Sequence, residues 1–265
     1  MPLALKIILL AIIQGFTEFF PVSSSGHLIL FQKILGFSTM PLVFDIFFHI
    51  GTLLAVVVFF FRDLRELALR FYEKNNFHLL ALLIAASLPT AVIGFLFKDF
   101  FESLFSDTSK LGFAFLFTAA ALLASKYLRL RIRLPELASA MIIGVAQGIA
   151  IIPGVSRSGL TIAMALILGL GFGFSFRFSF LLSIPAILGA AAVKTKPLIA
   201  MVNSGTGVGI AELALGAVAA ALSGYLAVRF MLWIIKEKSL RGFAWYVWAL
   251  GILIISDQVV FHRFF

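Results

Sequence analysis

The chain has no cysteine and little charge: of its 265 residues, 12% are charged and 62% are hydrophobic. Without cysteine it has neither disulfide bonds nor thiol chemistry. No polar stretch exceeds the length of a loop, so no water-soluble domain can be separated from the rest. Acidic residues are scarce, 12 against 21 basic ones, but the bases lie in short loops between apolar runs, as topogenic charges do. The sequence is therefore that of an integral membrane protein, and no nucleic-acid partner is expected.

Two common sequence signals are also missing. Residues 203–209, Asn-Ser-Gly-Thr-Gly-Val-Gly, are rich in glycine, but the Lys-Ser or Lys-Thr of a phosphate-binding loop does not follow them. We interpret these residues as a linker. Small residues do not mark a cleavage site after the first apolar run, so we expect no cleaved signal peptide.

Apolar segments dominate the rest of the chain. They fall at 2–19, 25–36, 42–61, 77–97, 111–128, 136–152, 158–170, 175–193, 208–235 and 242–261. A full membrane span takes about 20 residues, whereas roughly 10–14 indicate a segment that enters the membrane and returns. Segments 25–36 and 158–170 are short, and each follows helix-breaking residues. We therefore predict two re-entrant helical hairpins, 2–36 and 136–170, and read the other segments as full spans.

The order of these elements predicts the fold. Each half, 1–128 and 136–265, has a hairpin that returns to its own side, followed by three spans. The second half therefore starts from the opposite face. The predicted fold is an all-α polytopic membrane protein, a single membrane domain over 1–265 that is built as an inverted-topology repeat.

Loop charges predict the orientation. Basic residues gather in loops 62–76, 126–133 and 229–241, which the topology places on one side, the cytoplasmic one. Loops 98–110 and 194–207 carry fewer bases and fall outside, as do both termini. We expect loop 98–110, which has mixed charge, to be a solvated connection.

Groups that can do chemistry gather in residues 14–27, between two apolar runs. This stretch holds a carboxylate at Glu18, an imidazole at His27 and several hydroxyls. Ionisable side chains inside hydrocarbon are costly, and they are functional by default. Pro21 and Gly26 should break the helix, which frees backbone N–H groups for an anionic ligand or for buried protein contacts.

A second copy of this pattern begins at Gln147. Gln147-Gly148 matches Gln14-Gly15, and Ser156-Arg157-Ser158-Gly159 matches Ser23-Ser24-Ser25-Gly26. The copies differ in charge, because Glu18 and His27 are not repeated and Arg157 replaces Ser24. Interrupted helices in corresponding halves predict a site between them near the middle of the membrane.

The two motifs resemble those of a known family. They read Gln-x-x-x-Glu leading into Pro-Val-Ser-Ser-Ser-Gly-His, and Pro-Gly-Val-Ser-Arg-Ser-Gly. With the chain length and the segment order, they resemble the BacA-type undecaprenyl pyrophosphate phosphatases, the bacitracin-resistance family. Its first motif position is Glu or Gln, and this chain has Gln14.

The resemblance implies an activity and a location. The enzyme would lie in the bacterial cytoplasmic (inner) membrane, remove the terminal phosphate from undecaprenyl (C55) diphosphate, and return the monophosphate carrier to peptidoglycan synthesis. The resemblance also implies dependence on a divalent metal and an active site open to the outer, periplasmic face.

Phosphoanhydride cleavage requires groups that neutralise developing charge and align a nucleophile. Arg157 suits the first task, because its planar guanidinium binds two phosphate oxygens at once; the alternative is a topogenic arginine. Glu18 lies at i+4 from Gln14, so the two could hold Mg²⁺ or Ca²⁺ together with the diphosphate. Alternatively, Glu18 forms a purely structural salt bridge with Arg157, and Gln14 caps or bridges the broken helices.

The sequence leaves the nucleophile open. We favour Ser24 assisted by His27, but attack by His27 itself or by water is also compatible with the motif. A histidine in an apolar segment is otherwise most often a satisfied core residue. The further candidates for binding substrate phosphate are Ser23, Ser25, Gly26, Ser156, Ser158, Gly159 and Thr161.

Asp45 and His49 form a further i, i+4 pair at the start of span 42–61. They are placed to support the site or to carry protons. A pair that simply satisfies its own hydrogen bonds is the alternative.

Transport is the alternative function, because inverted repeats with broken helices are typical of secondary transporters. The unequal charge of the two motifs favours the enzyme, since transport requires only binding. The expected partners are an isoprenoid diphosphate lipid and the surrounding membrane lipid, and a homodimer is compatible with the sequence.

Overall fold

The computed structural model describes residues 1–37, 42–128, 130, 136–203, 209–234 and 239–261, and the described residues contain helices and no strand. The helices are α1 (Leu3–Phe19), α2 (Ser24–Ile34), α3 (Leu42–Phe59), α4 (Phe61–Leu69), α5 (Lys74–Leu96), α6 (Lys98–Ser106), α7 (Leu111–Tyr127), α8 (Glu136–Ile149), α9 (Arg157–Ile167), α10 (Phe172–Asn203), α11 (Ile210–Ile234) and α12 (Arg241–Ser256). Short 3₁₀ and π turns at Thr108–Lys110 and Asp257–Phe261 complete the regular structure of the described residues.

The predicted spans agree with the helices. Among the described residues, 5 helices are long and apolar enough to cross a membrane, namely α5, α7 with its preceding turn, α10, α11 and α12. Helix α3 joins them as a 6th span if it is counted together with α4, from which it is bent by 73°. The chain is thus an all-α polytopic membrane protein, as predicted.

Some predicted loops are helical instead. Loop 98–110 is not a plain solvated connection, because it contains α6, whose Phe101 and Leu104 are buried while its charged residues face outward. Helix α4 likewise occupies the start of loop 62–76, and α10 continues to Asn203. Parts of loop 126–133, of linker 203–209 and of loop 229–241 lie outside the described residues.

Both predicted hairpins are interrupted at their motifs. Helix α1 stops at Phe19, and Phe20 takes an extended conformation (φ −69°, ψ 142°), because a residue before proline is pushed out of the helical region. Ser23 then adopts a positive φ of 72° before α2 begins. In the second hairpin, Gly154 has a φ of 90° between α8 and α9, a conformation that glycine adopts without strain.

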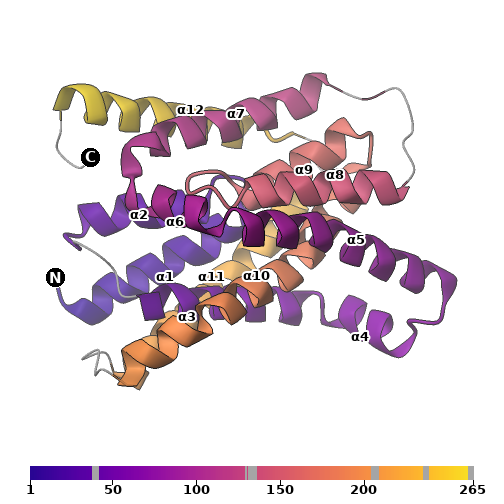
Figure 1. Cartoon of the computed structure of the whole chain (residues 1–265), viewed down its shortest axis with the longest axis horizontal. Helices are drawn as coiled ribbons and strands as arrows, with labels where there is room; N and C mark the ends of the chain where they lie inside the picture. Colours follow the sequence, from indigo (N-terminus) through magenta and orange to yellow (C-terminus); the bar gives the residue numbers. More distant parts are fainter. Residues whose placement is uncertain (38–41, 129, 131–135, 204–208, 235–238, 262–265) are drawn as a thin grey trace.

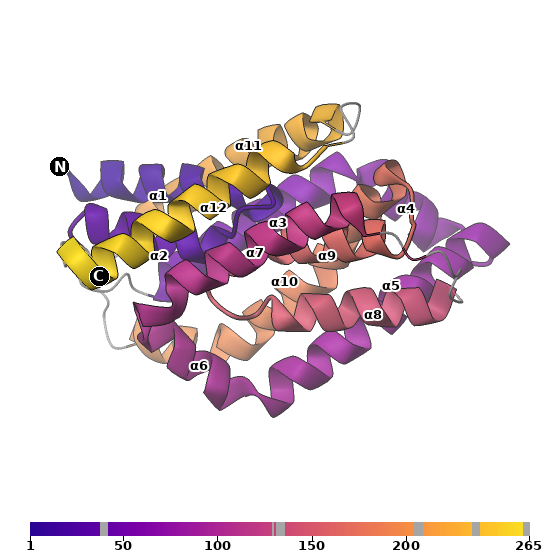
Figure 2. The same ribbon diagram turned by 90° about the horizontal axis from the view of Figure 1, so that it is seen from above.

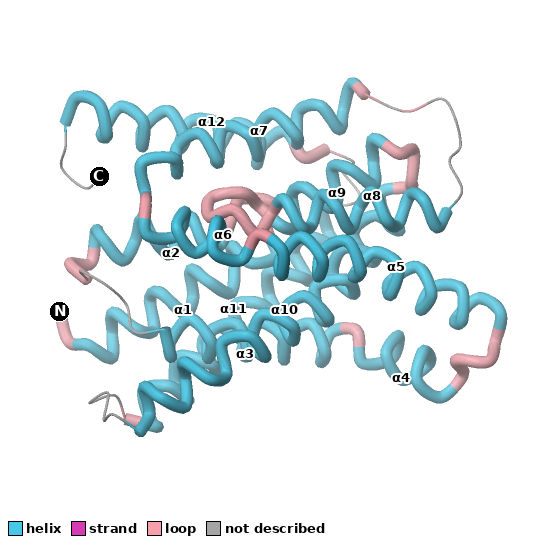
Figure 3. Tube along the Cα trace, viewed as in Figure 1, coloured by secondary structure: helices cyan, strands magenta, loops and turns pink. Residues whose placement is uncertain are grey.

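The hairpins point at each other from opposite ends of the bundle. In Figure 1, α1 starts at the left-hand end beside the N-terminus and α2 returns toward that end, whereas α8 and α9 lie to the right. The loop between α8 and α9 therefore reaches the middle of the molecule, where it stands out among the cyan helices in Figure 3. The site motifs lie at these two tips.

The remaining helices hold the hairpins in place. Helix α1 packs on α11, α8 packs on α5, and α7 packs on α12, which lies along the top of Figure 1 and faces the viewer in Figure 2. Small residues permit these contacts: a Cβ on Gly15 would lie 1.9 Å from Ser223 Oγ, and one on Gly144 would lie 2.0 Å from the Ala86 carbonyl oxygen. Each hairpin is therefore fixed to a long helix by close backbone approach.

Candidate active site

The carboxylate of Glu18 is the centre of the candidate site. Glu18 lies in the last turn of α1 and is 7% exposed, and Arg157 is the first residue of α9. Arg157 Nη2 lies 2.7 Å from Glu18 Oε1. The acid of the first motif and the cation of the second, far apart in sequence, thus meet where the two hairpin tips meet.

The second carboxylate oxygen of Glu18 accepts two more hydrogen bonds. Ser24 Oγ donates to Oε2 at 2.6 Å, and Gln14 Nε2 donates to it at 3.0 Å. Four residues that the motifs single out, Gln14, Glu18, Ser24 and Arg157, are therefore in direct contact. Ser24 and Arg157 are half-buried, whereas Gln14 and Glu18 are buried.

His27 points elsewhere. Its Nδ1 lies 2.7 Å from the Ser23 carbonyl oxygen, and its Nε2 lies 2.8 Å from the hydroxyl of Tyr246 on α12. The ring stacks on Tyr246 with centroids 5.7 Å apart and is 2% exposed. Because both ring nitrogens have these partners, the geometry does not place His27 as the base for Ser24. The group that Ser24 contacts is Glu18.

Two of the serines predicted to bind phosphate cap the helices at the tips. Ser23 Oγ accepts from Gly26 N at 3.3 Å and caps α2, and Ser156 Oγ accepts from Gly159 N at 3.0 Å and caps α9. Serine is favoured at helix starts because its oxygen satisfies an N–H that the helix leaves unpaired. These two side chains are almost fully buried.

The other tip hydroxyls join one hairpin to the other or to α10. Ser25 Oγ accepts from Gly154 N at 3.3 Å, and Ser158 Oγ donates to the Phe20 carbonyl oxygen at 3.0 Å. The Thr161 hydroxyl lies 2.6 Å from the hydroxyl of Ser179. Their observed contacts are thus structural, and they dock the two motifs together.

The two motif glycines also have packing roles. A Cβ on Gly26 would lie 2.6 Å from Phe115 Cζ, and one on Gly159 would lie 2.9 Å from Ser156 Cβ. The missing side chain therefore lets the start of α2 pack against Phe115, and it lets the start of α9 pack against Ser156.

Residues outside the motifs complete the site. Thr118 on α7 accepts a hydrogen bond from Ser156 N at 3.0 Å, and the Ser179 carbonyl oxygen accepts one from Arg157 Nη1 at 3.5 Å. The sequence did not predict Thr118, Ser179 or Tyr246 as part of the site. No local pattern marks them, because each reaches the tips only through the packing of a distant helix.

His49 on α3 lies at the edge of the cluster. Its Nε2 is 3.9 Å from Glu18 Oε2, and its Nδ1 is 2.7 Å from the Asp45 carbonyl oxygen and 3.4 Å from Asp45 Oδ1. The i, i+4 pair is thus in contact, as one alternative expected. Within this pair, His49 is the member that lies near the Glu18 carboxylate.

The donor set limits how a metal could bind. Among the described residues, no three His, Cys, Asp or Glu side chains gather as a metal site. Gln14 Oε1 is buried without a hydrogen-bond partner within the described part of the chain, beside the Glu18 carboxylate. Gln147 Oε1 is also unpaired there, but no carboxylate accompanies it in its motif. One carboxylate and one amide oxygen fit a hard cation only as part of a shell that substrate oxygens complete.

Comparison with known proteins assigns the sequence of this chain to a family. Residues 7–253 match the family described as "Bacitracin resistance protein BacA". The chain is 43% identical over 264 residues to "Undecaprenyl-diphosphatase" of Halothermothrix orenii, a match that covers 97% of this chain and 98% of the relative. It is 44% identical over 254 residues to the protein of that name in Carboxydothermus hydrogenoformans (95% of this chain, 96% of the relative). With "Undecaprenyl-diphosphatase 4" of Bacillus thuringiensis it shares 41% identity over 258 residues (96% and 97%). The chain belongs to the BacA family.

Proposed function

We propose that this protein is a membrane phosphatase that hydrolyses undecaprenyl (C55) diphosphate to undecaprenyl phosphate and inorganic phosphate. The observation that carries the proposal is the Glu18 carboxylate, which contacts the Ser24 hydroxyl and the Arg157 guanidinium at once. A hydroxyl, a base and a cation in direct contact are the parts that phosphoryl transfer requires. The names of the relatives agree with this chemistry.

The geometry assigns a role to each group. Arg157 binds the terminal phosphate and stabilises charge on its oxygens in the transition state. Ser24 Oγ attacks the terminal phosphorus, its proton passes to Glu18, and the bond to the bridging oxygen breaks, so that undecaprenyl phosphate leaves. Water then hydrolyses the phosphoserine and releases inorganic phosphate.

Two other routes use residues of the same two motifs. In the first, Glu18 directs a water molecule at phosphorus instead of the serine. In the second, His27 attacks, which requires its ring to leave both Ser23 and Tyr246. The contact between Ser24 and Glu18 at 2.6 Å favours the serine route.

We propose Mg²⁺ or Ca²⁺ as the cofactor. Gln14 Oε1 and the Glu18 carboxylate would hold the ion, and the unpaired amide oxygen supports this proposal. When bound, the ion would neutralise the charge of the diphosphate.

We also propose the bacterial cytoplasmic membrane as the location, with the site open to the periplasmic face. Support comes from the basic turn between α4 and α5, which lies at the right-hand end of Figure 1, away from the N-terminus. The opposite directions of the two hairpins support an inverted repeat with halves 1–128 and 136–265. A homodimer stays a prediction.

Transport is not carried further, because the relatives reported above are named for hydrolysis. The test is release of inorganic phosphate from an isoprenyl diphosphate by the detergent-solubilised protein, with and without EDTA. We expect release that EDTA abolishes and Mg²⁺ restores, and that Arg157→Ala lowers by at least about a hundredfold. Absence of release from the folded protein in the presence of Mg²⁺ and of Ca²⁺ would refute the activity, and release that survives EDTA would refute the metal.

A further inference from the structure

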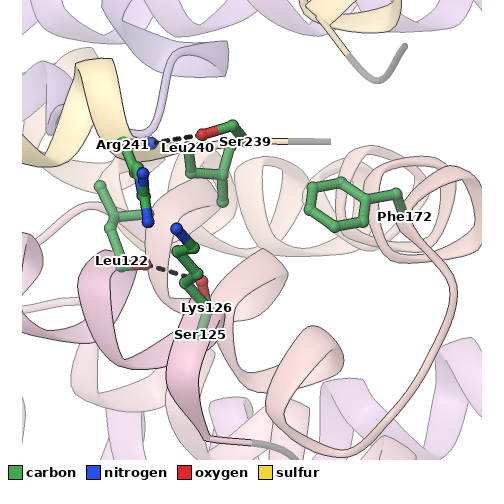
Figure 4. Close-up of a pocket in the computed structure, with 7 residues that line it drawn as sticks. All are labelled: Leu122, Ser125, Lys126, Phe172, Ser239, Leu240 and Arg241. Atoms are coloured by element: carbon green, nitrogen blue, oxygen red, sulfur yellow. Dashed lines mark hydrogen bonds between the residues drawn. The ribbon is translucent and has the colours of Figure 1, made fainter. Parts of the chain in front are cut away.

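A cavity of about 280 Å³ lies at the end of the bundle where α7 stops and α12 begins. Figure 4 shows its walls, which come from α7, from the start of α10 and from the residues that lead into α12. Neither Glu18 nor Arg157 lines this cavity. It is therefore separate from the candidate active site, and the proposed reaction leaves it without a role.

Two cations face each other across the cavity's polar side. In Figure 4, the guanidinium of Arg241 and the ammonium of Lys126 point into the same space. Among the described residues that line the cavity, none is acidic. Arg241 Nη2 lies 3.5 Å from the Tyr127 hydroxyl, and Lys126 Nζ lies 5.3 Å from the centre of the same ring. These neutral contacts do not balance two like charges, whereas an anion between them would.

The start of α12 adds to the positive potential. Its N-cap, Leu240, offers no side-chain hydrogen bond to the first turn, so N–H groups there are open to another acceptor. Ser239 Oγ accepts a hydrogen bond from Arg241 N at 3.4 Å and lies on the cavity wall, so this first N–H is already taken and the open ones follow it. A phosphate oxygen is the kind of acceptor that a helix start, an arginine and a lysine share.

The rest of the cavity is apolar. Leu122 and Leu240 are buried in its wall, and the ring of Phe172 faces the cations from the other side in Figure 4. A free phosphate ion would make no favourable contact with these apolar side chains. A lipid would, because its phosphate continues into a glycerol backbone and acyl chains.

The position of the cavity agrees with a lipid. It lies at the ends of two helices that are long and apolar enough to cross the membrane, α7 and α12, and so at the depth of the lipid head groups. Basic pockets between spanning helices at this depth bind anionic head groups.

We propose that this cavity is a binding site for the phosphate head group of an anionic membrane phospholipid. Lys126, Arg241 and the first turn of α12 hold the phosphate. Leu122, Leu240 and Phe172 contact the glycerol and the first carbons of the acyl chains.

The experiment measures phosphatidylglycerol bound to the full-length protein in a neutral detergent, by native mass spectrometry over a series of lipid concentrations. Phosphatidylcholine and inorganic phosphate are titrated in parallel. The variant is Lys126→Ala/Arg241→Ala, and the matched control is Arg62→Ala/Arg65→Ala, which removes the same charge from exposed positions of α4.

We expect phosphatidylglycerol to bind at least about tenfold more tightly to the wild type than to the Lys126/Arg241 variant, a difference of about 1.4 kcal/mol. The control should stay within about twofold of the wild type, since Arg62 and Arg65 do not line the cavity and act only through the general surface potential. Lys126→Gln, a single change at an exposed residue, should also weaken phosphatidylglycerol binding. It replaces the double variant in the comparison if the double variant does not fold.

Three results would overturn the proposal. Phosphatidylcholine has the same phosphate beside a quaternary ammonium, so its equal binding would show that the cavity does not select an anionic head group. Equal losses in the control pair would reduce the effect to surface charge, and displacement of the lipid by equimolar inorganic phosphate would make the cavity a site for free anions. Because the readout is lipid binding, each result is independent of whether the protein hydrolyses a diphosphate.

Discussion

The contact between Glu18 and Arg157 can be tested by a double-mutant cycle that separates catalysis from structure. The variants are Glu18→Gln, Arg157→Gln and the two together. Glutamine keeps the shape of glutamate, is a shorter polar replacement for arginine, and removes the charge at both positions. Each variant is assayed for phosphate release and for its thermal unfolding midpoint.

The burial of the pair sets the expected magnitude. Glu18 is 7% exposed and the Arg157 side chain 14% exposed, so the pair is closer to a buried salt bridge than to a surface one. An exposed pair contributes about 0–1 kcal/mol. Removal of one partner from a buried pair costs about 3–5 kcal/mol, because the other charge is left buried and uncompensated. Each single variant should thus unfold at a clearly lower temperature.

The double variant decides between the two roles. With both charges removed, no buried charge is left uncompensated, so most of the lost stability should return. Activity should not return, because the double variant has neither a base for Ser24 nor a guanidinium for phosphate. Loss of the base alone is expected to lower the rate by about 10²–10⁴-fold.

The opposite outcome would refute the proposed site. If the double variant regains phosphate release along with its stability, the pair is a structural salt bridge and the reaction occurs elsewhere. If the single variants lose activity without loss of stability, the uncompensated-charge argument is wrong, although a catalytic role stands.

Three further predictions follow from other contacts. Tyr246→Phe removes the hydroxyl that contacts His27 Nε2 at 2.8 Å, and the free energy of unfolding should fall by about 0.5–1.5 kcal/mol, as loss of one partly buried hydrogen bond implies. Gly15→Ala places a methyl group against α11 and should cost about 1–3 kcal/mol, measured as a lower unfolding midpoint. Single cysteines at Asn75 and Asp99, in a chain that has no natural cysteine, should react with an impermeant maleimide from opposite sides of the membrane.

Each of these predictions has a control or a result that contradicts it. Trp245→Phe changes an exposed ring next to Tyr246, and an equal loss of unfolding free energy there would remove the role of the hydroxyl. Gly173→Ala meets no atom within 4 Å, so it should keep the wild-type midpoint, and an equal loss would discredit the packing argument. Labelling of both cysteines from the same side would contradict the predicted topology.

Much of the fold could be predicted because local rules act on short stretches of sequence. The apolar segments fixed the number of spans, and Pro21 forced the extended conformation of Phe20 that ends α1. The helix breaks also predicted where the site lies. Helices α4 and α6 were missed, because their mixed composition resembles that of a loop and only burial of one face stabilises them.

The site could be predicted only in part. The unequal charges of the two motifs suggested that Glu18 and Arg157 meet, and they do. The sequence did not reveal that His27 turns toward Tyr246, because that contact depends on how α12 packs. Nor could it show that Ser23 and Ser156 serve as helix caps, since a serine at a tip can equally face a ligand.

The most direct test of the account is the rate of phosphate release by Ser24→Ala, compared with Ser25→Ala. Ser24 donates to the Glu18 carboxylate, whereas Ser25 accepts from the backbone of the other tip. If Ser24 is the nucleophile, its alanine variant should lose at least about a thousandfold in kcat, while Ser25→Ala keeps most of its activity. A Ser24→Ala protein that is folded and hydrolyses undecaprenyl diphosphate at close to the wild-type rate would contradict the account.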